Sequence, residues 1–458
     1  MDQKDNQILN GSIPRALISF FIPCWLGLMF QQLYNTVDTW IVGNFVSTEA
    51  VAAVGSVGIA VQFVIGICAS IASGAGVVIS QHYGAGKFRQ LKTDIRSSLL
   101  IAVLGGAVLT GLCAAYADEM VVWLKTPADI APDSETYLFV YFLAMIPNLI
   151  YNFGAAILRG MGDSRRPLIV LAVTSLVNIA LDVVFVMWLG WDVFGVALAT
   201  DISQIISAVL ILWLLIRQIP DLFDKDEPGE SVYGEIFRIG LPTAFQSIMY
   251  SGSNVLIQIA INGFSTAVIA AWSIYGKVDC ICWMTMSSMG MAVTAFAGQN
   301  FGAGNYDRVK KGAWVSSKLL AGSLIVLIAI CYGWAPVIFG WFTKDTEVVV
   351  QGTRMLRFLT PAYMLYFLIE ILPGVLHGCG DVVVPTIASI IGICLIRVLW
   401  LRYVLPVYNS MDTVMMSYVV TWALTSVFYV IYFTNMGWLK RCIARAKAAA
   451  DKKAEERI

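Results

Sequence analysis

Two duplicated motifs constrain this chain more than any other feature. Gln-His-Tyr-Gly-Ala-Gly-Lys at residues 81–87 returns as Gln-Asn-Phe-Gly-Ala-Gly-Asn at 299–305. Leu-Arg-Gly-Met-Gly-Asp at 158–163 returns as Leu-His-Gly-Cys-Gly-Asp at 376–381, and both pairs are 218 residues apart. Because two unrelated motifs share one offset, the sequence indicates an internal duplication whose halves meet near residue 220.

The composition is that of an integral membrane protein. The 458 residues are 58% hydrophobic and 13% charged, with a mean hydropathy of +0.75, whereas soluble domains average about 45–50% apolar and about 25% charged. The zero net charge predicts no nucleic-acid partner. Each half contains six apolar runs long enough to cross a bilayer. The predicted spans are 15–43, 50–81, 95–117, 134–158, 165–188, 193–216, 235–262, 266–298, 313–340, 348–376, 382–406 and 412–437.

The distribution of Lys and Arg predicts that both termini are cytoplasmic. That orientation places 23 of the 30 basic residues on the inner side. Six spans per half is an even number, so the repeats are parallel. The first apolar run has no cleavage site after it and is expected to remain as the first span. We predict a six-helix lobe at 1–216, a cytoplasmic linker at 217–238, a second lobe at 239–437 and a basic cytoplasmic tail at 438–458.

Two acids lie inside predicted spans of the first half. Asp38 falls in the first span and Asp182 in the fifth, whereas the matching positions of the second half hold Leu256 and Trp400. Ionisable groups inside a bilayer are costly, and they usually face a cavity or a partner. The two halves are therefore expected to have different tasks.

Amide and hydroxyl groups accompany these acids. Asn178 precedes Asp182 by one helical turn, and Tyr34 and Asn35 crowd one face of the first span with Asp38. A carboxylate with amide and hydroxyl oxygens suits Na⁺. The same carboxylates, removed from water, could instead carry a proton. A structural hydrogen-bond network between helices is the third interpretation.

The second half offers candidates for a substrate cavity. Its first span has a polar stripe spaced every four residues, namely Gln246, Tyr250, Asn254 and Gln258, which matches Gln31, Asn35 and Asp38 in the first half. The stripe could join helices or line a wet cavity. Methionines in span eight, Met286 among them, could adapt to apolar ligands or simply fill the core. The remaining candidates are Lys277, Asp279 and Glu370; Arg397 could neutralise either acid or take part in transport.

Taken together, these features resemble the multidrug and toxic compound extrusion (MATE) family. The resemblance rests on the Gly-Ala-Gly loops after spans two and eight, on Leu-Arg-Gly-Met-Gly-Asp after span four and on Asn-x-x-x-Asp in span five, and it covers roughly residues 10–440. It implies an all-α membrane protein of 12 transmembrane helices, in two parallel six-helix repeats that form a V-shaped, two-lobed transporter. The cation site that it implies uses Asp38, Asn178, Asp182 and Thr200, with Tyr34 lining it and Asn152 contributing an amide.

We therefore expect a secondary active antiporter that exports cationic or amphipathic compounds in exchange for H⁺ or Na⁺. It is expected to be a monomer in the plasma or inner membrane with small drug-like substrates and no cofactor. A flippase of lipid-linked saccharides is the main alternative, and it would need a more cationic cavity than Lys277 and Arg397 provide. A membrane enzyme would need clustered His, Asp or Cys at one face, and a sugar or peptide porter would need a charged loop after span two. The choice between Na⁺ and H⁺ stays open, because the same oxygens serve both.

Overall fold

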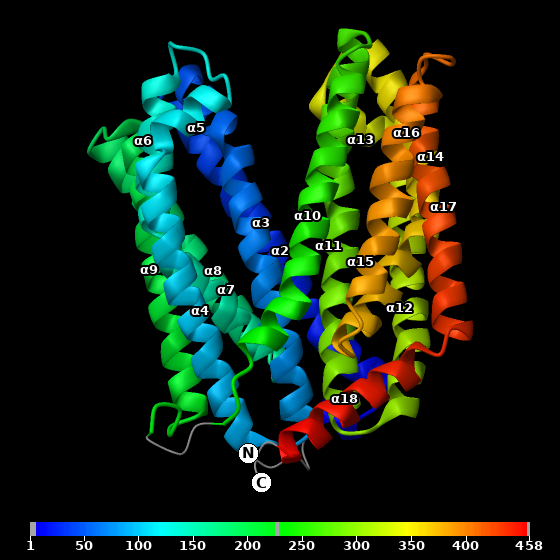
Figure 1. The fold of residues 1–458 in the computed structure, drawn as a ribbon. Coiled ribbons are helices and arrows are strands. Elements are labelled where there is room, and N and C mark those ends of the chain that lie inside the picture. The colour runs from blue at the N-terminus through cyan, green and yellow to red at the C-terminus, as the bar shows by residue number, and fades with distance from the viewer. Residues whose placement is uncertain (1–5, 225–228, 456–458) are drawn as a thin grey trace. The chain divides into compact units, whose positions relative to one another are not determined.

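The computed structural model describes residues 6–224 and 229–455, and it is all-helical over these ranges. Part of the predicted linker, 225–228, and the end of the predicted tail, 456–458, lie outside the described residues. Figure 1 shows the helices in chain order. Their bounds are α1 Gln7–Asn10, α2 Ile13–Phe45, α3 Thr48–Gly84, α4 Phe88–Ala115, α5 Ala117–Trp123, α6 Ala131–Leu143, α7 Met145–Gly160, α8 Arg165–Asp182, η2 Val183–Trp188, α9 Asp192–Gln218, α10 Tyr233–Ile261, α11 Thr266–Gly302, α12 Tyr306–Gly333, α13 Ala335–Phe342, α14 Thr346–Gly378, α15 Val383–Ser389, η3 Ile390–Leu395, α16 Ile396–Tyr403, α17 Met411–Asn435 and α18 Trp438–Glu455.

All twelve predicted spans fall on helices. In the described part of the chain, ten helices are long and apolar enough to cross a membrane, and α6 with α7 would form an eleventh span bent by 53°. The helix α10 is the remaining predicted span and is not among the ten. Its polar stripe, which includes Gln246 and Asn254, lowers its hydropathy. The fold is thus the all-helical, multi-span type that the sequence predicts, although the number twelve rests on α10.

The chain folds into two compact units that do not coincide with the two sequence halves. The N-terminal unit is Ser19–Ala244, and the C-terminal unit combines Met1–Ile18 with Phe245–Ile458. The boundaries therefore lie inside α2 and α10. The first turns of each of these helices belong with the opposite half of the sequence. The predicted lobe boundaries near residues 217 and 238 refer to the sequence repeats and not to these compact units, and they stay a prediction.

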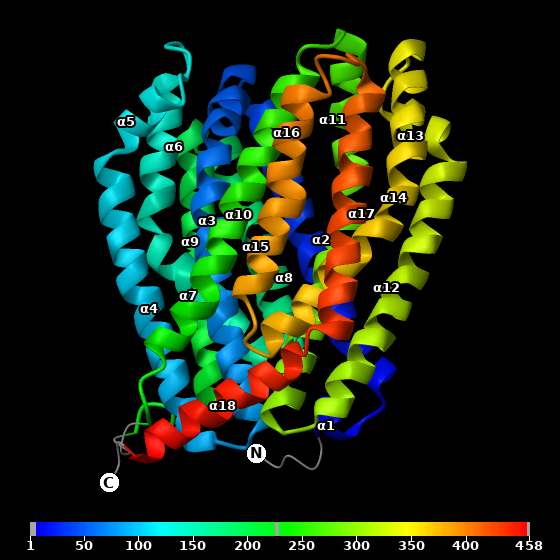
Figure 2. The ribbon, with the colours of Figure 1, turned by 45° about the vertical axis from the view of Figure 1, so that its right-hand side comes forward.

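Each unit is built on closely packed helices. In the N-terminal unit α3, α4, α7 and α9 enclose a core that contains Ile79, Leu158 and Ile211. In the C-terminal unit α11 packs along α14, with α12 and α17 against them (Figure 2). A Cβ atom at Gly160 would lie 2.6 Å from the Gly76 carbonyl, and one at Gly378 would lie 2.6 Å from the Thr294 carbonyl. Glycine at this repeated motif position therefore permits close helix packing in both units.

The duplicated Gly-Ala-Gly motifs form the same turn in both units. Gly86 and Gly304 have positive φ angles of 70° and 75°. The amide of Lys87 donates to the carbonyl of residue 82 over 3.1 Å, and the amide of Asn305 donates to that of residue 300 over 2.8 Å. The left-handed conformation favours glycine. The duplicated motif is therefore a structural turn in both units.

Side chains just after each turn bind the segment that leads into the first span of the opposite sequence half. In the N-terminal unit Gln90 exchanges two hydrogen bonds with the backbone of Glu230, of 2.7 and 2.8 Å. Arg308 holds the equivalent position in the C-terminal unit and donates to the carbonyls of Ile8 and Gly11. These contacts explain why residues before Ser19, and those from 229 to 244, group with the opposite half.

We predict that Arg308→Gln lowers thermal stability, because the carbonyls of Ile8 and Gly11 lose a charged donor. Hydrogen bonds to charged groups contribute roughly 1.5–3 kcal/mol. The measurement is thermal unfolding of the purified protein in detergent, followed by the fluorescence of its tryptophans. Lys310→Gln is the matched control, because Lys310 is exposed and lies on the same helix. Equal melting temperatures for the two variants would contradict this account of the Arg308 contacts.

Candidate functional site

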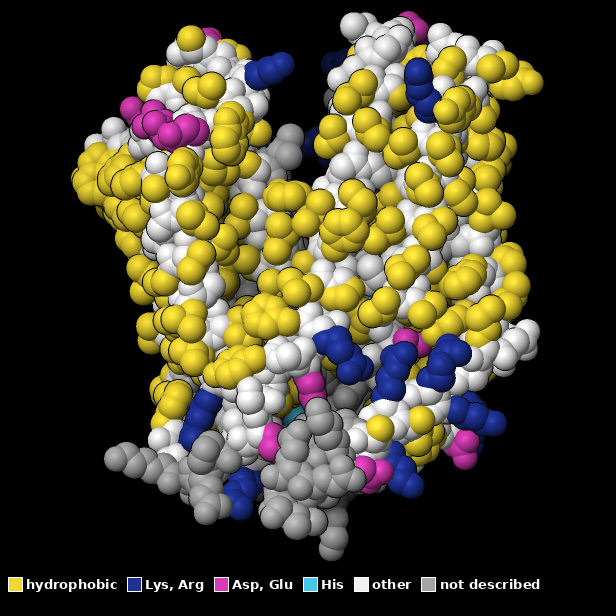
Figure 3. Space-filling model, viewed as in Figure 1, with side chains coloured by type: hydrophobic (Ala, Val, Ile, Leu, Met, Phe, Trp, Pro, Cys, Tyr) yellow, Lys and Arg dark blue, Asp and Glu magenta, His cyan; other side chains and the backbone are white. Residues whose placement is uncertain are grey.

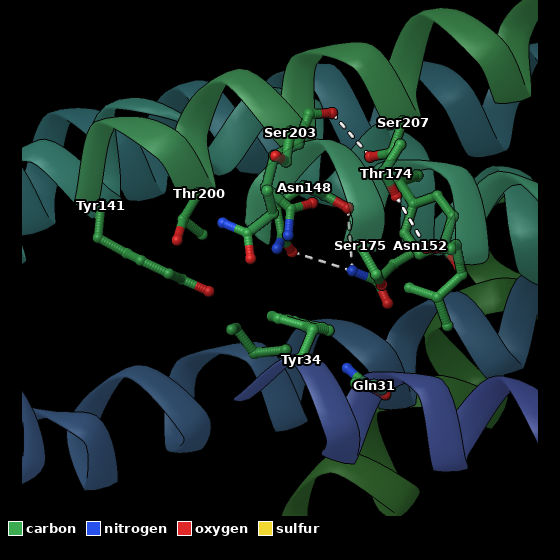
Figure 4. Close-up of a pocket in the computed structure, with 15 residues that line it drawn as sticks. Gln31, Tyr34, Tyr141, Asn148, Asn152, Thr174, Ser175, Thr200, Ser203 and Ser207 are labelled. Carbon is green, nitrogen blue, oxygen red and sulfur yellow. Dashed lines mark hydrogen bonds between the residues drawn. The ribbon is translucent and has the colours of Figure 1, made fainter. Parts of the chain in front are cut away.

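Polar side chains of the N-terminal unit surround a small cavity of about 80 Å³. It is lined by residues of α2, α3, α6, α7, α8 and α9, most of which carry hydroxyl or amide groups (Figure 4). The lining residues are Gln31, Tyr34, Ile65, Tyr141, Asn148, Tyr151, Asn152, Leu171, Thr174, Ser175, Asn178, Thr200, Ser203, Gln204 and Ser207. A water molecule requires roughly 10–15 Å³ of such cavity volume. The cavity therefore has room for a few waters or a partly hydrated cation and is too small for a drug-sized molecule.

Asp182 lies at the end of α8 and is completely buried. Neither of its carboxylate oxygens has a hydrogen-bond partner among the described residues. A π-helical segment, η2, begins at the next residue, and such segments are frequent at functional sites because they interrupt the α-helical bonding pattern. A fully buried carboxylate without a donor is costly, so this site calls for a positive charge or a proton.

Asn178 and Asp38 share this lack of partners. Asn178, one turn before Asp182, is 2% exposed, and both its amide nitrogen and its amide oxygen are unpaired in the described part of the chain. One oxygen of Asp38 on α2 is also buried without a partner there. The carboxyl groups of Asp38 and Asp182 lie within electrostatic range of each other. Two neighbouring carboxylates are stabilised when they share a proton or when one cation binds both.

The structure brings the predicted coupling residues together. Tyr34, Asn178 and Thr200 all line the cavity, with Tyr34 approaching from α2 opposite the residues of α8 and α9 (Figure 4). Asp38 lies one turn beyond Tyr34, and Asp182 lies one turn beyond Asn178. Asn152, which the family resemblance implies as an amide of the cation site and which is also a candidate for the substrate cavity, lines this cavity too. Its amide donates to the backbone and side-chain oxygens of Asn148, each over 2.9 Å. Asn35, by contrast, is exposed and is not a lining residue.

A third acid, not predicted from the sequence, lies in the same region as Asp38 and Asp182. Asp201 on α9 follows Thr200, is 6% exposed and has one buried oxygen without a partner in the described ranges. Tyr137 of α6 lies within electrostatic range of all three carboxyls, those of Asp38, Asp182 and Asp201. The sequence could have indicated Asp201, because an acid inside the sixth predicted span is itself unusual.

Asp279 in the C-terminal unit differs from Asp182, because hydrogen-bond donors surround it. Its carboxylate accepts hydrogen bonds from the Tyr363 hydroxyl, from the Tyr275 hydroxyl over 3.4 Å and from the Trp283 indole nitrogen over 2.9 Å. Arg397 is 4% exposed and stacks on the ring of Tyr418 at 4.2 Å. Asp279 is therefore stabilised by neutral donors.

The other predicted substrate residues are distributed over the C-terminal unit. Glu370 lies against α11, where a Cβ atom at Gly290 would be 2.4 Å from its carboxylate. Met286 is fully buried, as core packing would require. Lys277 and Asn254 are exposed, and Gln246 donates to the Tyr250 hydroxyl over 3.2 Å. The predicted substrate cavity stays a prediction.

Comparison with known proteins assigns the chain to a class and then to a family. An all-helical chain with this many apolar spans and buried polar groups is typical of membrane transporters. The MatE family model matches residues 23–184 and 242–401. The chain therefore belongs to the multidrug and toxic compound extrusion (MATE) family, as the motifs predict, and it is a multi-pass membrane transporter rather than an enzyme.

Individual relatives are similar over nearly the full length. "Probable multidrug resistance protein YoeA" from Bacillus subtilis is 28% identical and covers 95% of this chain and 96% of its own length. "Probable multidrug resistance protein NorM" from Thermotoga maritima is 24% identical, with 94% of each chain covered. A solved structure of the outward-facing conformation of a multidrug resistance MATE family transporter has a TM-score of 0.87 and 21% identity, and covers 95% of this chain and 98% of that chain. The structural likeness supports the fold.

We predict opposite effects on stability for the same substitution at Asp182 and at Asp279. Asp182→Asn should leave the melting temperature in Na⁺-free buffer unchanged or raise it, because it removes a carboxylate that no described group stabilises. Asp279→Asn should lower it by several degrees, since the neutral amide accepts more weakly from Tyr363, Tyr275 and Trp283. Thermal unfolding of both variants beside the wild type is the measurement. A larger loss for Asp182→Asn than for Asp279→Asn would be inconsistent with the two environments.

Proposed function

We propose that this protein is a secondary active efflux antiporter that exports cationic or amphipathic compounds in exchange for H⁺ or Na⁺. The observation that carries the proposal is the group of unpaired oxygens and amides around Asp38, Asn178 and Asp182. Several relatives bear names that describe multidrug resistance or export, which supports drug-like compounds as substrates. The proposed transport involves no chemical reaction and no cofactor.

The coupling site in this proposal is the polar cavity of the N-terminal unit. Asp38 and Asp182 provide the negative charge, Asn178 and Thr200 provide neutral oxygens, and Tyr34 lines the cavity. These hard oxygen ligands suit Na⁺, and the paired carboxyls would equally hold one proton between them. A Na⁺ site would use Asp38, Asn178 and Asp182. Both assignments account for the missing hydrogen-bond partners.

Coupling requires that the cation bind one conformation more tightly than another. Asp38 and Tyr34 lie on α2, which continues into the other compact unit before Ser19 and contains Pro23. A proline inside a helix removes one backbone hydrogen bond and permits a bend. Neutralising Asp38 would therefore act on a helix that belongs to both units. By thermodynamic reciprocity, cation binding and substrate binding then affect each other by the same factor.

The proposed location is the plasma or inner membrane, with both termini in the cytoplasm. The excess of Lys and Arg on one side of the predicted spans supports this orientation. A monomer is the proposed functional form, because the residues of the coupling site all come from one chain. The proposed substrate residues, among them Gln246, Tyr250, Asn254, Met286, Lys277, Asp279 and Glu370, are to be tested separately from the coupling site.

We predict that efflux of a cationic dye such as ethidium is lost in Asp38→Asn and in Asp182→Asn, because neither amide can carry the coupling charge. The measurement is dye movement in proteoliposomes with a pH gradient and a Na⁺ gradient imposed separately. Asp118→Asn, at an exposed acid of α5, is the matched control. Transport driven by the pH gradient alone means proton exchange, and transport that needs Na⁺ means a metal site. Wild-type efflux by Asp38→Asn or by Asp182→Asn would remove that residue from the mechanism.

Asp201 gives a graded prediction. Its carboxyl is near the other two without being part of the predicted Asn-x-x-x-Asp pattern, so it should contribute electrostatic attraction rather than direct coupling. We expect Asp201→Asn to weaken the apparent affinity for the driving cation by about tenfold, equivalent to roughly 1.4 kcal/mol, while the maximal rate changes little. Initial efflux rates over a range of Na⁺ or H⁺ concentrations measure this. Complete loss of efflux at saturating cation would instead make Asp201 an essential coupling residue.

A further inference from the structure

The repeated aspartate of the second motif has different partners in the two units. Asp163 accepts hydrogen bonds from the backbone amides of Arg165 and Arg166 over 3.0 and 3.1 Å, and it pairs with the Arg166 side chain at 3.3 Å. All of these partners lie within three residues. The equivalent Asp381 is followed by Val383 and Val384, which carry no charge.

Asp381 finds its partners farther along the chain. It is 2% exposed, accepts a hydrogen bond of 2.6 Å from the Tyr432 hydroxyl and lies 3.7 Å from the guanidinium of Arg445. Arg441 donates to the same Tyr432 hydroxyl over 2.8 Å. Tyr432 belongs to α17, and both arginines belong to α18. The C-terminal helix thus supplies the positive charge that Arg166 supplies in the first motif.

The helix α18 is held close to the end of the last span. Only Met436 and Gly437 separate it from α17, and Gly437 has a positive φ of 59° that turns the chain. Trp438 is buried, and its indole donates to the Phe433 carbonyl over 2.9 Å. In Figures 1 and 2, α18 runs across the direction of α17 instead of continuing it. It therefore lies near the level at which the last span leaves the membrane.

The sequence of α18 separates into two faces. Trp438, Leu439 and Cys442 are buried. Four basic residues are exposed on the rest of the helix, namely Lys440, Arg441, Arg445 and Lys447. Figure 3 shows Lys and Arg side chains, with some Asp and Glu side chains among them, below the apolar band at the end of the molecule where α18 lies. Four or more basic residues directly after a membrane span are characteristic of segments that bind anionic lipid headgroups.

We propose that α18 is a binding surface for the headgroups of anionic phospholipids, and that Arg445 connects this surface to the second motif through Asp381. Lys440 and Lys447 provide positive charge on exposed positions beside the membrane surface, and the apolar face keeps the helix attached to its unit. Lipid phosphates would then stabilise α18 in the position at which Arg445 meets Asp381. This inference concerns a site separate from the coupling cavity and does not depend on the direction of transport.

The test compares the full-length protein in vesicles of phosphatidylcholine alone with vesicles that also contain phosphatidylglycerol. Amide hydrogen exchange of residues 438–448, followed by mass spectrometry, reports how firmly α18 is held. We expect exchange to be several-fold slower with phosphatidylglycerol, and this difference should shrink at high salt because exposed charges are screened. Equal exchange in the two lipid compositions would overturn the proposal and would leave α18 as a helix held by its contacts within the protein.

Two variants separate lipid binding from the internal contacts. The double variant K440Q/K447Q should lose the lipid-dependent slowing and keep the wild-type exchange rate in phosphatidylcholine. Its charge-matched control is K310Q/K311Q, which removes two exposed charges from α12 and should keep the lipid dependence of α18. Arg445→Gln should speed exchange of α18 in both compositions, because Asp381 loses its charged partner. Lipid dependence that persists in K440Q/K447Q would also overturn the proposal.

Discussion

The cost of burying a carboxylate away from water governs how the acids of this protein are arranged. Asp279 meets that cost with three neutral donors from Tyr363, Tyr275 and Trp283. Asp182 is completely buried, yet the described residues offer it no donor. One carboxylate is therefore satisfied by its fold, whereas the other has no hydrogen-bond donor in the described part of the chain. This difference supports the proposed coupling role of Asp182, because a buried carboxylate without donors is stabilised by a bound cation or a proton.

The duplication supplies a common scaffold on which the two halves have diverged. Identical turns at Gly86 and Gly304 and matching helix contacts at Gly160 and Gly378 preserve the packing of both repeats. The residues that bind the leading segments differ in chemistry, with Gln90 in one unit and Arg308 in the other. The repeats thus retain backbone geometry, while their side chains carry separate functions. The unpaired carboxylates are concentrated in the N-terminal unit.

Repeat symmetry also shows where one half depends on a distant segment. Asp163 is served by its immediate neighbours, but Asp381 depends on Tyr432 and Arg445. A local ion pair has been replaced by one that requires α17 and α18 to be folded. The C-terminal helix is consequently part of the structure of the second repeat, in addition to carrying exposed basic residues.

The sequence by itself determined the membrane-spanning all-α class, the duplication, the position of the helices and the family, because long apolar runs and a fixed offset are local or linear features. It also identified Asp38, Asn178 and Asp182, since acids inside apolar spans are conspicuous. Only the tertiary structure decided which polar groups lack donors, that Asp201 joins the others, and that the leading segments of α2 and α10 group with the opposite half. These properties depend on contacts between residues far apart in the chain, and helical periodicity carries no information about which helix a polar face will meet.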